Sequence, residues 1–375
     1  MTVLVHFESL GIAISDVLMS IDKKGGGIRL PSIGLPEDAN RDLPIRPTSL
    51  VRKFFRVKRP GSSGIFLLCG TGSHIQEVIK NVEDLISGKS LPPAELVHKY
   101  VQNNVSSLVD IAAFMTECAG KNEFELLGYV DGISFFRHFP QTISQQLPYW
   151  GSVIAMGSGS RDLIEWLDQK GKSYEAHGLE SEDSHAKGLR ALNAVPSLLL
   201  EEDTRGMQTL KEGVGGYYES YMVGHGTLTP QDNVLTIFGR FKSTHVFELR
   251  RIFFHHYDAD TLVIGSLHGL PVEISDSEPI KVPLDSMKVF HVEPFGVTSQ
   301  ILWNSSRLAI MLNSAETMRL TTYRGSKDES IKRFYEGAGG QRLLTFHVTG
   351  NTLQLTLNAT LFKYYLSRSD KKVAM

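Results

Sequence analysis

Residues 2–16, TVLVHFESLGIAISD, form the stretch that decides the fold. Residues 2–7 and 11–14 have the alternating pattern of two short strands, and residues 8–10 join them. A hairpin of this length returns Asp16 towards Thr2. A hydroxyl and a carboxylate are therefore expected at the same end of one hairpin.

Thr2 is the candidate nucleophile because it directly follows Met1. Removal of Met1 would leave a threonine whose free α-amine lies beside its own hydroxyl. A neutral α-amine has an ordinary pKa of about 7.7–8.0, so it can accept the hydroxyl proton near neutral pH. Threonine is also a common second residue in proteins with no such activity, so Thr2 alone does not predict an enzyme.

Lys53 is the candidate partner of this nucleophile. It lies in a β-prone run, residues 50–57, among aromatic and β-branched neighbours. A lysine near Thr2 would lower the pKa of the hydroxyl by its charge and by hydrogen bonding, and Asp16 would hold the lysine. The alternative is a solvated lysine on an edge strand.

Two further motifs follow in the chain. Residues 64–73, GIFLLCGTGS, are a strand that runs into a glycine-rich turn, and apolar residues at helical spacing follow them. Residues 153–160, VIAMGSGS, are an apolar strand that ends in Gly-Ser-Gly, and a helix is predicted over 161–169. The chain resembles the proteasome-type N-terminal nucleophile hydrolases, particularly the bacterial proteasome-like peptidases. The resemblance lies in the order of Thr2, Asp16, Lys53 and these two motifs along the sequence.

The resemblance implies an α+β fold, a four-layer αββα sandwich, in residues 2–240. It also implies roles for individual residues: Ser158 lies beside the threonine amine, and backbone amides at Cys69 and Gly70 bind the oxyanion. The implied substrate is a peptide or another amide, and the implied assembly is a homo-oligomer that encloses its sites. No cofactor and no metal ion are expected.

The remaining regions are predicted from local pattern. Residues 22–48 are a Gly- and Pro-rich loop insertion that could shape substrate access or plug the site. Residues 213–221 resemble a closing strand of the first domain, with residues 234–241 as its partner. Residues 241–366 read as many short strands, which predicts a smaller β-rich sandwich or barrel that could bind a protein partner. Residues 367–375 are predicted to be a flexible polar tail.

Composition narrows the function classes. A formal net charge of −2 argues against nucleic acid as a general partner, and the basic residues Arg52 to Arg59 are interpreted as a solvated strand end. Neither a leader segment nor an apolar run of about 18 residues occurs, so no membrane partner and a cytoplasmic location are expected. Cys69 and Cys118 are predicted to be buried free thiols. His255-His256 is interpreted as a loop or strand end without metal.

Three functions fit these residues. The first is a threonine hydrolase that cleaves amide bonds after removal of Met1. The second is a catalytically inactive assembly or binding protein that keeps the proteasome-like fold. The third is an amidase of the same chemistry that acts on a small molecule. Retention of Met1 would disfavour both enzymes, because it blocks the amine.

Overall fold

The computed structural model has a mixed α+β fold, and its strands form several separate sheets. It describes residues 2–21, 28–32, 46–59, 62–87, 108–119, 123–130, 133–136, 142–199, 210, 214–224, 227–242, 246–267, 272–275, 279–295, 311–313, 315, 317–322, 344–358, 360, 361 and 363. The chain divides into two compact units. The first comprises Met1–Ile28, Glu37–Gln231 and Glu293–Val297, and the second comprises Arg29–Pro36, Asp232–Val292 and Thr298–Met375.

The first sheet of the first unit is antiparallel and contains the N-terminal hairpin. Its strand order is β12–β11–β2–β1–β10–β9. Within it, a single 3-10 turn over Glu8–Leu10 joins β1 to β2, and Gly11 closes this turn with φ of +61°. The strands are β1 (Leu4–Phe7), β2 (Ile12–Asp16), β9 (Ile143–Leu147), β10 (Gly151–Met156), β11 (Tyr218–Gly224) and β12 (Thr227–Pro230).

A second antiparallel sheet, in the order β5–β6–β7–β8, faces the first across a shared apolar core. In β6 the side chains of Ile65, Leu67 and Cys69 lie in this core. Phe66 and Leu68 point to the opposite face, as the alternation of a strand requires. The strands are β5 (Phe54–Arg59), β6 (Ser62–Gly70), β7 (Phe124–Val130) and β8 (Ile133–Phe136).

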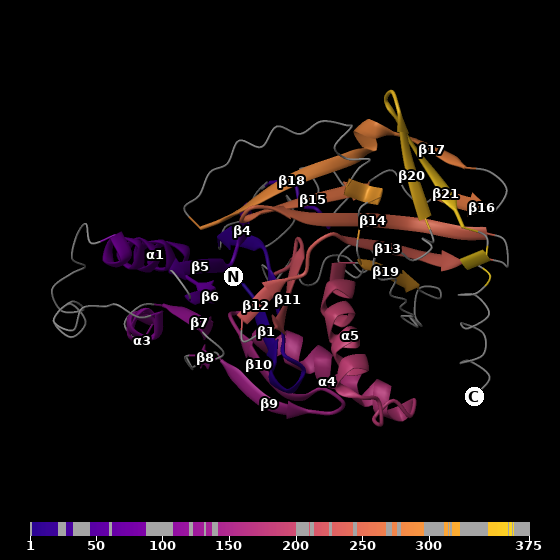
Figure 1. Ribbon diagram of the computed structural model, residues 1–375. Coiled ribbons are helices and arrows are strands. Elements are labelled where there is room, and N and C mark those ends of the chain that lie inside the picture. Colours follow the sequence, from indigo (N-terminus) through magenta and orange to yellow (C-terminus); the bar gives the residue numbers. More distant parts are fainter. Residues whose placement is uncertain are drawn as a thin grey trace. The chain divides into compact units, whose positions relative to one another are not determined.

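Helices cover the outer faces of both sheets (Figure 1). Helices α1 (Gly72–Ser87) and α3 (Leu108–Ala119) pack on the second sheet around a separate apolar cluster. Helices α4 (Ser160–Ala176) and α5 (Ser184–Ala194) pack on the first sheet, where α4 contacts β9 and β10 and α5 contacts β2. The helix predicted over 161–169 is thus confirmed and extends by seven residues, to Ala176.

Lys53 lies between two strands rather than within one. β4 (Arg46–Arg52) ends before it, and β5 begins after it. β4 pairs with β3 (Leu18–Ile21) on one side and with Glu293 and Pro294 on the other. The predicted single strand over 50–57 is therefore two strands in different sheets. Of the predicted insertion 22–48, residues 22–27 and 33–45 lie outside the described residues, and its ends join β3 to β4.

The second unit is built almost entirely of strands. One open sheet has the order β19–β13–β14–β15–β18, and a three-stranded sheet has the order β17–β21–β20. Both sheets contribute to one apolar core, so the described residues form a sandwich and not a closed barrel. The strands are β13 (Val234–Phe241), β14 (Val246–Asp258), β15 (Thr261–Leu267), β16 (Val272–Ser275), β17 (Ile280–Pro283), β18 (Met287–Pro294), β19 (Thr317–Thr322), β20 (Leu344–Thr349) and β21 (Thr352–Leu357).

Several sequence-based expectations are corrected. β13 does not pair with β11: it pairs with β14 and β19, while β11 pairs with β2 and β12. Its residues belong to the second unit, whose main part begins at Asp232 and not at residue 241. Met311 and Leu312 are helical, although residues 241–366 were expected to consist of strands. The predicted tail 367–375 lies outside the described residues.

His255 and His256 lie inside the long strand β14, not in a loop or at a strand end. His255 is buried and His256 is partly exposed, which fits side chains on opposite faces. Among the described residues, no three His, Cys, Asp or Glu side chains are arranged to hold a metal ion. Cys69 and Cys118 are buried free thiols, as predicted. In the described part of the chain, no helix has the length and apolarity to cross a membrane.

Candidate functional site

The turn that follows β10 holds Thr2 in place. The Thr2 backbone nitrogen donates a hydrogen bond to Ser158 Oγ at 3.2 Å, and the Gly159 N–H donates to the Thr2 carbonyl oxygen at 3.2 Å. Gly157 has φ of +87°, and a Cβ atom at this position would lie 2.3 Å from the Thr2 carbonyl oxygen. Only glycine fits this approach. The predicted neighbours Thr2 and Ser158 are thus brought together.

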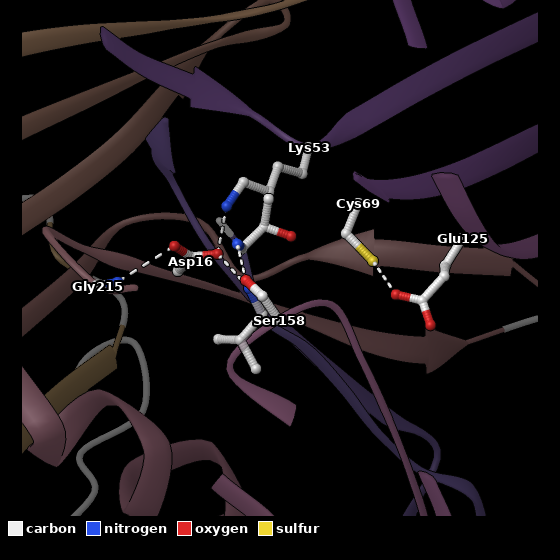
Figure 2. A network of polar contacts seen from close by, with 8 residues as sticks. Asp16, Lys53, Cys69, Glu125, Ser158 and Gly215 are labelled. Atoms are coloured by element: carbon white, nitrogen blue, oxygen red, sulfur yellow. Dashed lines mark hydrogen bonds and ion pairs between the residues drawn. The ribbon is translucent and has the colours of Figure 1, made fainter. Parts of the chain in front are cut away.

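Asp16 connects three segments of the first unit. The register of the β1–β2 hairpin pairs Leu4 with Ser15, and Val3 donates its N–H to Asp16 Oδ1 at 2.8 Å. The other carboxylate oxygen accepts the Gly215 N–H at 3.1 Å. Lys53 Nζ also donates to Oδ1, which forms an ion pair whose two side chains are fully buried. Figure 2 shows Lys53 and Gly215 approaching Asp16 from different segments.

Lys53 is a buried cation with more than one acidic neighbour. Burial lowers its pKa below the ordinary value, and the charge and hydrogen bond of Asp16 oppose this effect. Glu219 contributes a smaller opposing effect. Because Asp16 Oδ1 accepts from both Val3 and Lys53, the ammonium group is fixed relative to the residue that follows Thr2.

Cys69 lies at the end of β6 with its thiol inside the protein. The thiol donates to Glu125 Oε2 with an S···O distance of 3.4 Å. Burial, and then Glu125, raise the pKa of this thiol well above its ordinary value, whereas Lys53 and the Thr2 hydroxyl lower it less. The thiol therefore stays protonated at neutral pH and is a poor nucleophile. Its position beside Thr2 and Lys53 agrees with the predicted site.

Gly70 ends β6 in a conformation that needs glycine. Its φ is +134°, and a Cβ atom there would lie 2.5 Å from the Glu123 carbonyl oxygen. The chain then enters α1 at Gly72. A strand end followed by a helix start presents backbone N–H groups that suit a developing negative charge. Oxyanion binding by the amides of Cys69 and Gly70 stays a prediction.

The Thr2 hydroxyl is a buried polar group beside the Cys69 thiol. Thr2 is 2% exposed, and among the described residues its hydroxyl oxygen has no hydrogen-bond partner. The Cys69 thiol lies nearby, and the Thr2 hydroxyl lowers its pKa. Buried polar groups without partners are rare, and a reactive role is one explanation for such a group.

Sequence reasoning missed two buried acids near this site. Glu125 lies in the apolar strand FELLGYV, where it accepts hydrogen bonds from Gly157 and Cys69. Glu219 accepts from Arg52 Nε at 2.7 Å, and both side chains are almost fully buried. Arg52 is therefore not part of a solvated strand end, which corrects the sequence-based interpretation. A single acid within an apolar strand was the available signal for Glu125.

Comparison of the chain with protein-family models, with curated proteins and with solved structures finds no match. The chemical interpretation of the site is therefore built on its geometry.

Proposed function

We propose that the protein is a threonine hydrolase that cleaves an amide bond after removal of Met1, with a peptide as the first candidate substrate. One observation carries the proposal: Asp16 holds Lys53 and the backbone of Val3 with the same oxygen, directly beside Thr2. The packing of two facing sheets between two helix pairs supports assigning the first unit to the four-layer αββα class.

Each residue of the site has a separate role in the proposed reaction. With Met1 removed, the α-amine of Thr2 takes the hydroxyl proton while the hydroxyl oxygen bonds to the amide carbon. Lys53 lowers the pKa of the hydroxyl, and Asp16 orients Lys53. Backbone amides near Cys69 and Gly70 stabilise the oxyanion. The C–N bond then breaks, and the proton passes from the α-amine to the leaving amine.

The second half of the reaction reverses these roles. Water adds to the acyl-threonine ester and the α-amine takes its proton; the C–O bond to Thr2 then breaks to release the acid, and the α-amine returns the proton to the Thr2 oxygen. Ser158 orients the amine throughout, since its Oγ already accepts a hydrogen bond from the same nitrogen. Every group needed is supplied by this chain, apart from the substrate and water.

The homo-oligomer and the cytoplasmic location belong to the same proposal, and the homo-oligomer derives from the family resemblance. The alternative function, an inactive assembly or binding protein, differs from the hydrolase in a simple way. It requires no free amine at residue 2, so a retained Met1 favours it, whereas a free Thr2 is necessary for the hydrolase and does not by itself establish it.

The test is the intact mass and N-terminal residue of the natively purified protein, followed by treatment with a peptide β-lactone that acylates threonine hydroxyls. We expect a mass lower by one methionine residue and one lactone adduct on Thr2. Thr2→Ala should abolish the adduct, and Thr2→Ser should keep it. Retained Met1, or an adduct that persists in Thr2→Ala, would refute the proposal.

A further inference from the structure

Glu125 is a charged residue on the inner face of an otherwise apolar strand. In β7, Leu127 and Tyr129 lie in the core between the two sheets, and Glu125 occupies the same face. Its side chain is 5% exposed. Burying a carboxylate costs free energy unless hydrogen bonds compensate. The groups that supply these bonds therefore indicate the role of Glu125.

Three groups donate to this carboxylate. Thr142 Oγ1 donates to Oε1 at 2.6 Å. Oε2 accepts both the Cys69 thiol, at 3.4 Å, and the Gly157 backbone N–H. Figure 2 shows the carboxylate of Glu125 next to the Cys69 thiol. Glu125 thus connects the end of β6, where the oxyanion amides are proposed, to the turn after β10.

That turn surrounds Thr2. Gly157 lies against the Thr2 carbonyl oxygen, Ser158 Oγ accepts from the Thr2 nitrogen, and Gly159 donates to the Thr2 carbonyl. Because Glu125 holds the first residue of the turn, a change in its reach would displace all three contacts together. Glu125 acts through the turn and not by touching the reacting atoms.

We propose that Glu125 is a positioning residue that sets the distance between the nucleophile and the oxyanion amides, an inference that rests on the proposed hydrolase function. The hydrogen bonds carry the role, and the charge does not. A glutamine can reproduce them: its carbonyl oxygen accepts from Gly157 and Cys69, and its NH2 group donates to the Thr142 hydroxyl. An aspartate keeps the charge but is one methylene too short.

The experiment compares Glu125→Asp with Glu125→Gln. The rate of Thr2 acylation by the peptide β-lactone should fall by about 10–100-fold in Glu125→Asp, as small misplacements of reacting groups do. It should stay within about threefold of wild type in Glu125→Gln. Glu165→Asp is the matched control, because it makes the same change at an exposed position of α4. This control should react like wild type.

Hydrogen exchange of residues 157–160, measured by mass spectrometry, gives a readout that needs no activity. Glu125→Asp should speed exchange in this segment, also in a Thr2→Ala background, whereas Glu125→Gln should not. Thr142→Val removes only the hydroxyl group that donates to Glu125 Oε1, so it should speed the exchange of residues 157–160 less. This variant replaces Glu125→Asp if that protein does not fold.

The outcomes separate the two proposals. Wild-type protein that is never acylated would refute the hydrolase, while faster exchange in Glu125→Asp would still support the positioning role. Slowing of acylation in Glu125→Gln that equals or exceeds the slowing in Glu125→Asp would overturn the positioning role, because the hydrogen bonds that glutamine can reproduce would then not be sufficient. Exchange in Glu125→Asp and Thr142→Val that matches wild type would overturn it as well.

Discussion

Variants of the Asp16–Lys53 ion pair test directly how this site is held. Some of them should regain folding stability without regaining reactivity. Lys53→Met removes a cation from a position with no solvent exposure and leaves the Asp16 carboxylate buried. Breaking a buried ion pair by removing one partner costs about 3–5 kcal/mol. Asp16 keeps its bonds to Val3 and Gly215, so we expect the lower half of this range, about 3–4 kcal/mol.

Removal of both charges should behave differently. In Lys53→Met/Asp16→Asn, no unpaired charge is buried, and the asparagine oxygen can still accept the Val3 N–H. Replacing a whole buried pair by neutral groups is often close to neutral. The double variant should therefore be at least about 2 kcal/mol more stable than the sum of the two single losses predicts. It should nevertheless fail to react with the lactone.

Urea unfolding followed by tryptophan fluorescence measures these differences. Trp150 and Trp166 belong to the first unit, and a Trp303→Phe background removes the tryptophan of the second unit. With a slope of about 2–3 kcal/mol per molar urea, a 3 kcal/mol loss shifts the midpoint by about 1 M or more. Additive losses in the double variant would refute the paired-charge reasoning, and an active double variant would refute the role of Lys53.

Three further outcomes can be checked. Burial lowers the pKa of His6 from 6.5 to about 4, so the unfolded chain binds a proton more readily than the folded protein does. The free energy of unfolding should therefore fall by about 3 kcal/mol as the pH drops from about 6.5 to about 4. An NMR titration of the imidazole, assigned by its loss in His6→Gln, checks this, and a midpoint near 6.5 would contradict it. Gly157→Ala should destabilise the protein by about 2 kcal/mol or more and stop acylation of Thr2, because its Cβ atom would clash with the backbone of Thr2. Gly178 also has a positive φ but has open space around it, so Gly178→Ala should lower the free energy of unfolding less. If both cost the same in thermal unfolding, backbone strain and not the clash dominates. Ser158→Ala should slow acylation by about tenfold and move its pH profile, because the Thr2 amine loses an acceptor; an unchanged profile would exclude this role.

Local parts of the site were predictable from the sequence. The β1–β2 hairpin joins residues close in the chain, so strand pattern and turn length sufficed to return Asp16 to Thr2. Strand β6 is a short apolar run that ends in a glycine-rich turn, and helix α1 has apolar residues at a period of 3.6. The contact between Ser158 and Thr2 spans 156 positions, and it was expected only through the order of motifs shared with a known family.

The rest depends on pairings that periodicity does not encode. Both faces of β7 are buried, so the alternation of the strand did not show which face Glu125 lies on, and a single acid in an apolar strand was the available signal. Arg52 looked solvated because its partner, Glu219, lies 167 residues away. The pattern of Val234–Phe241 predicts a strand but not the strands that pair with it, and this strand lies in the second unit. Such outcomes are set by tertiary packing.

The close approach of Gly157 to Thr2 gives a criterion for recognising other sequences that share this backbone arrangement. A chain that keeps this backbone arrangement must keep glycine at the matching position, whatever its chemistry, because the constraint comes from the main chain of residue 2 and not from its hydroxyl. Sequences that keep the glycine but lack the threonine and the lysine are expected to keep the backbone arrangement without the groups that the proposed hydrolase needs.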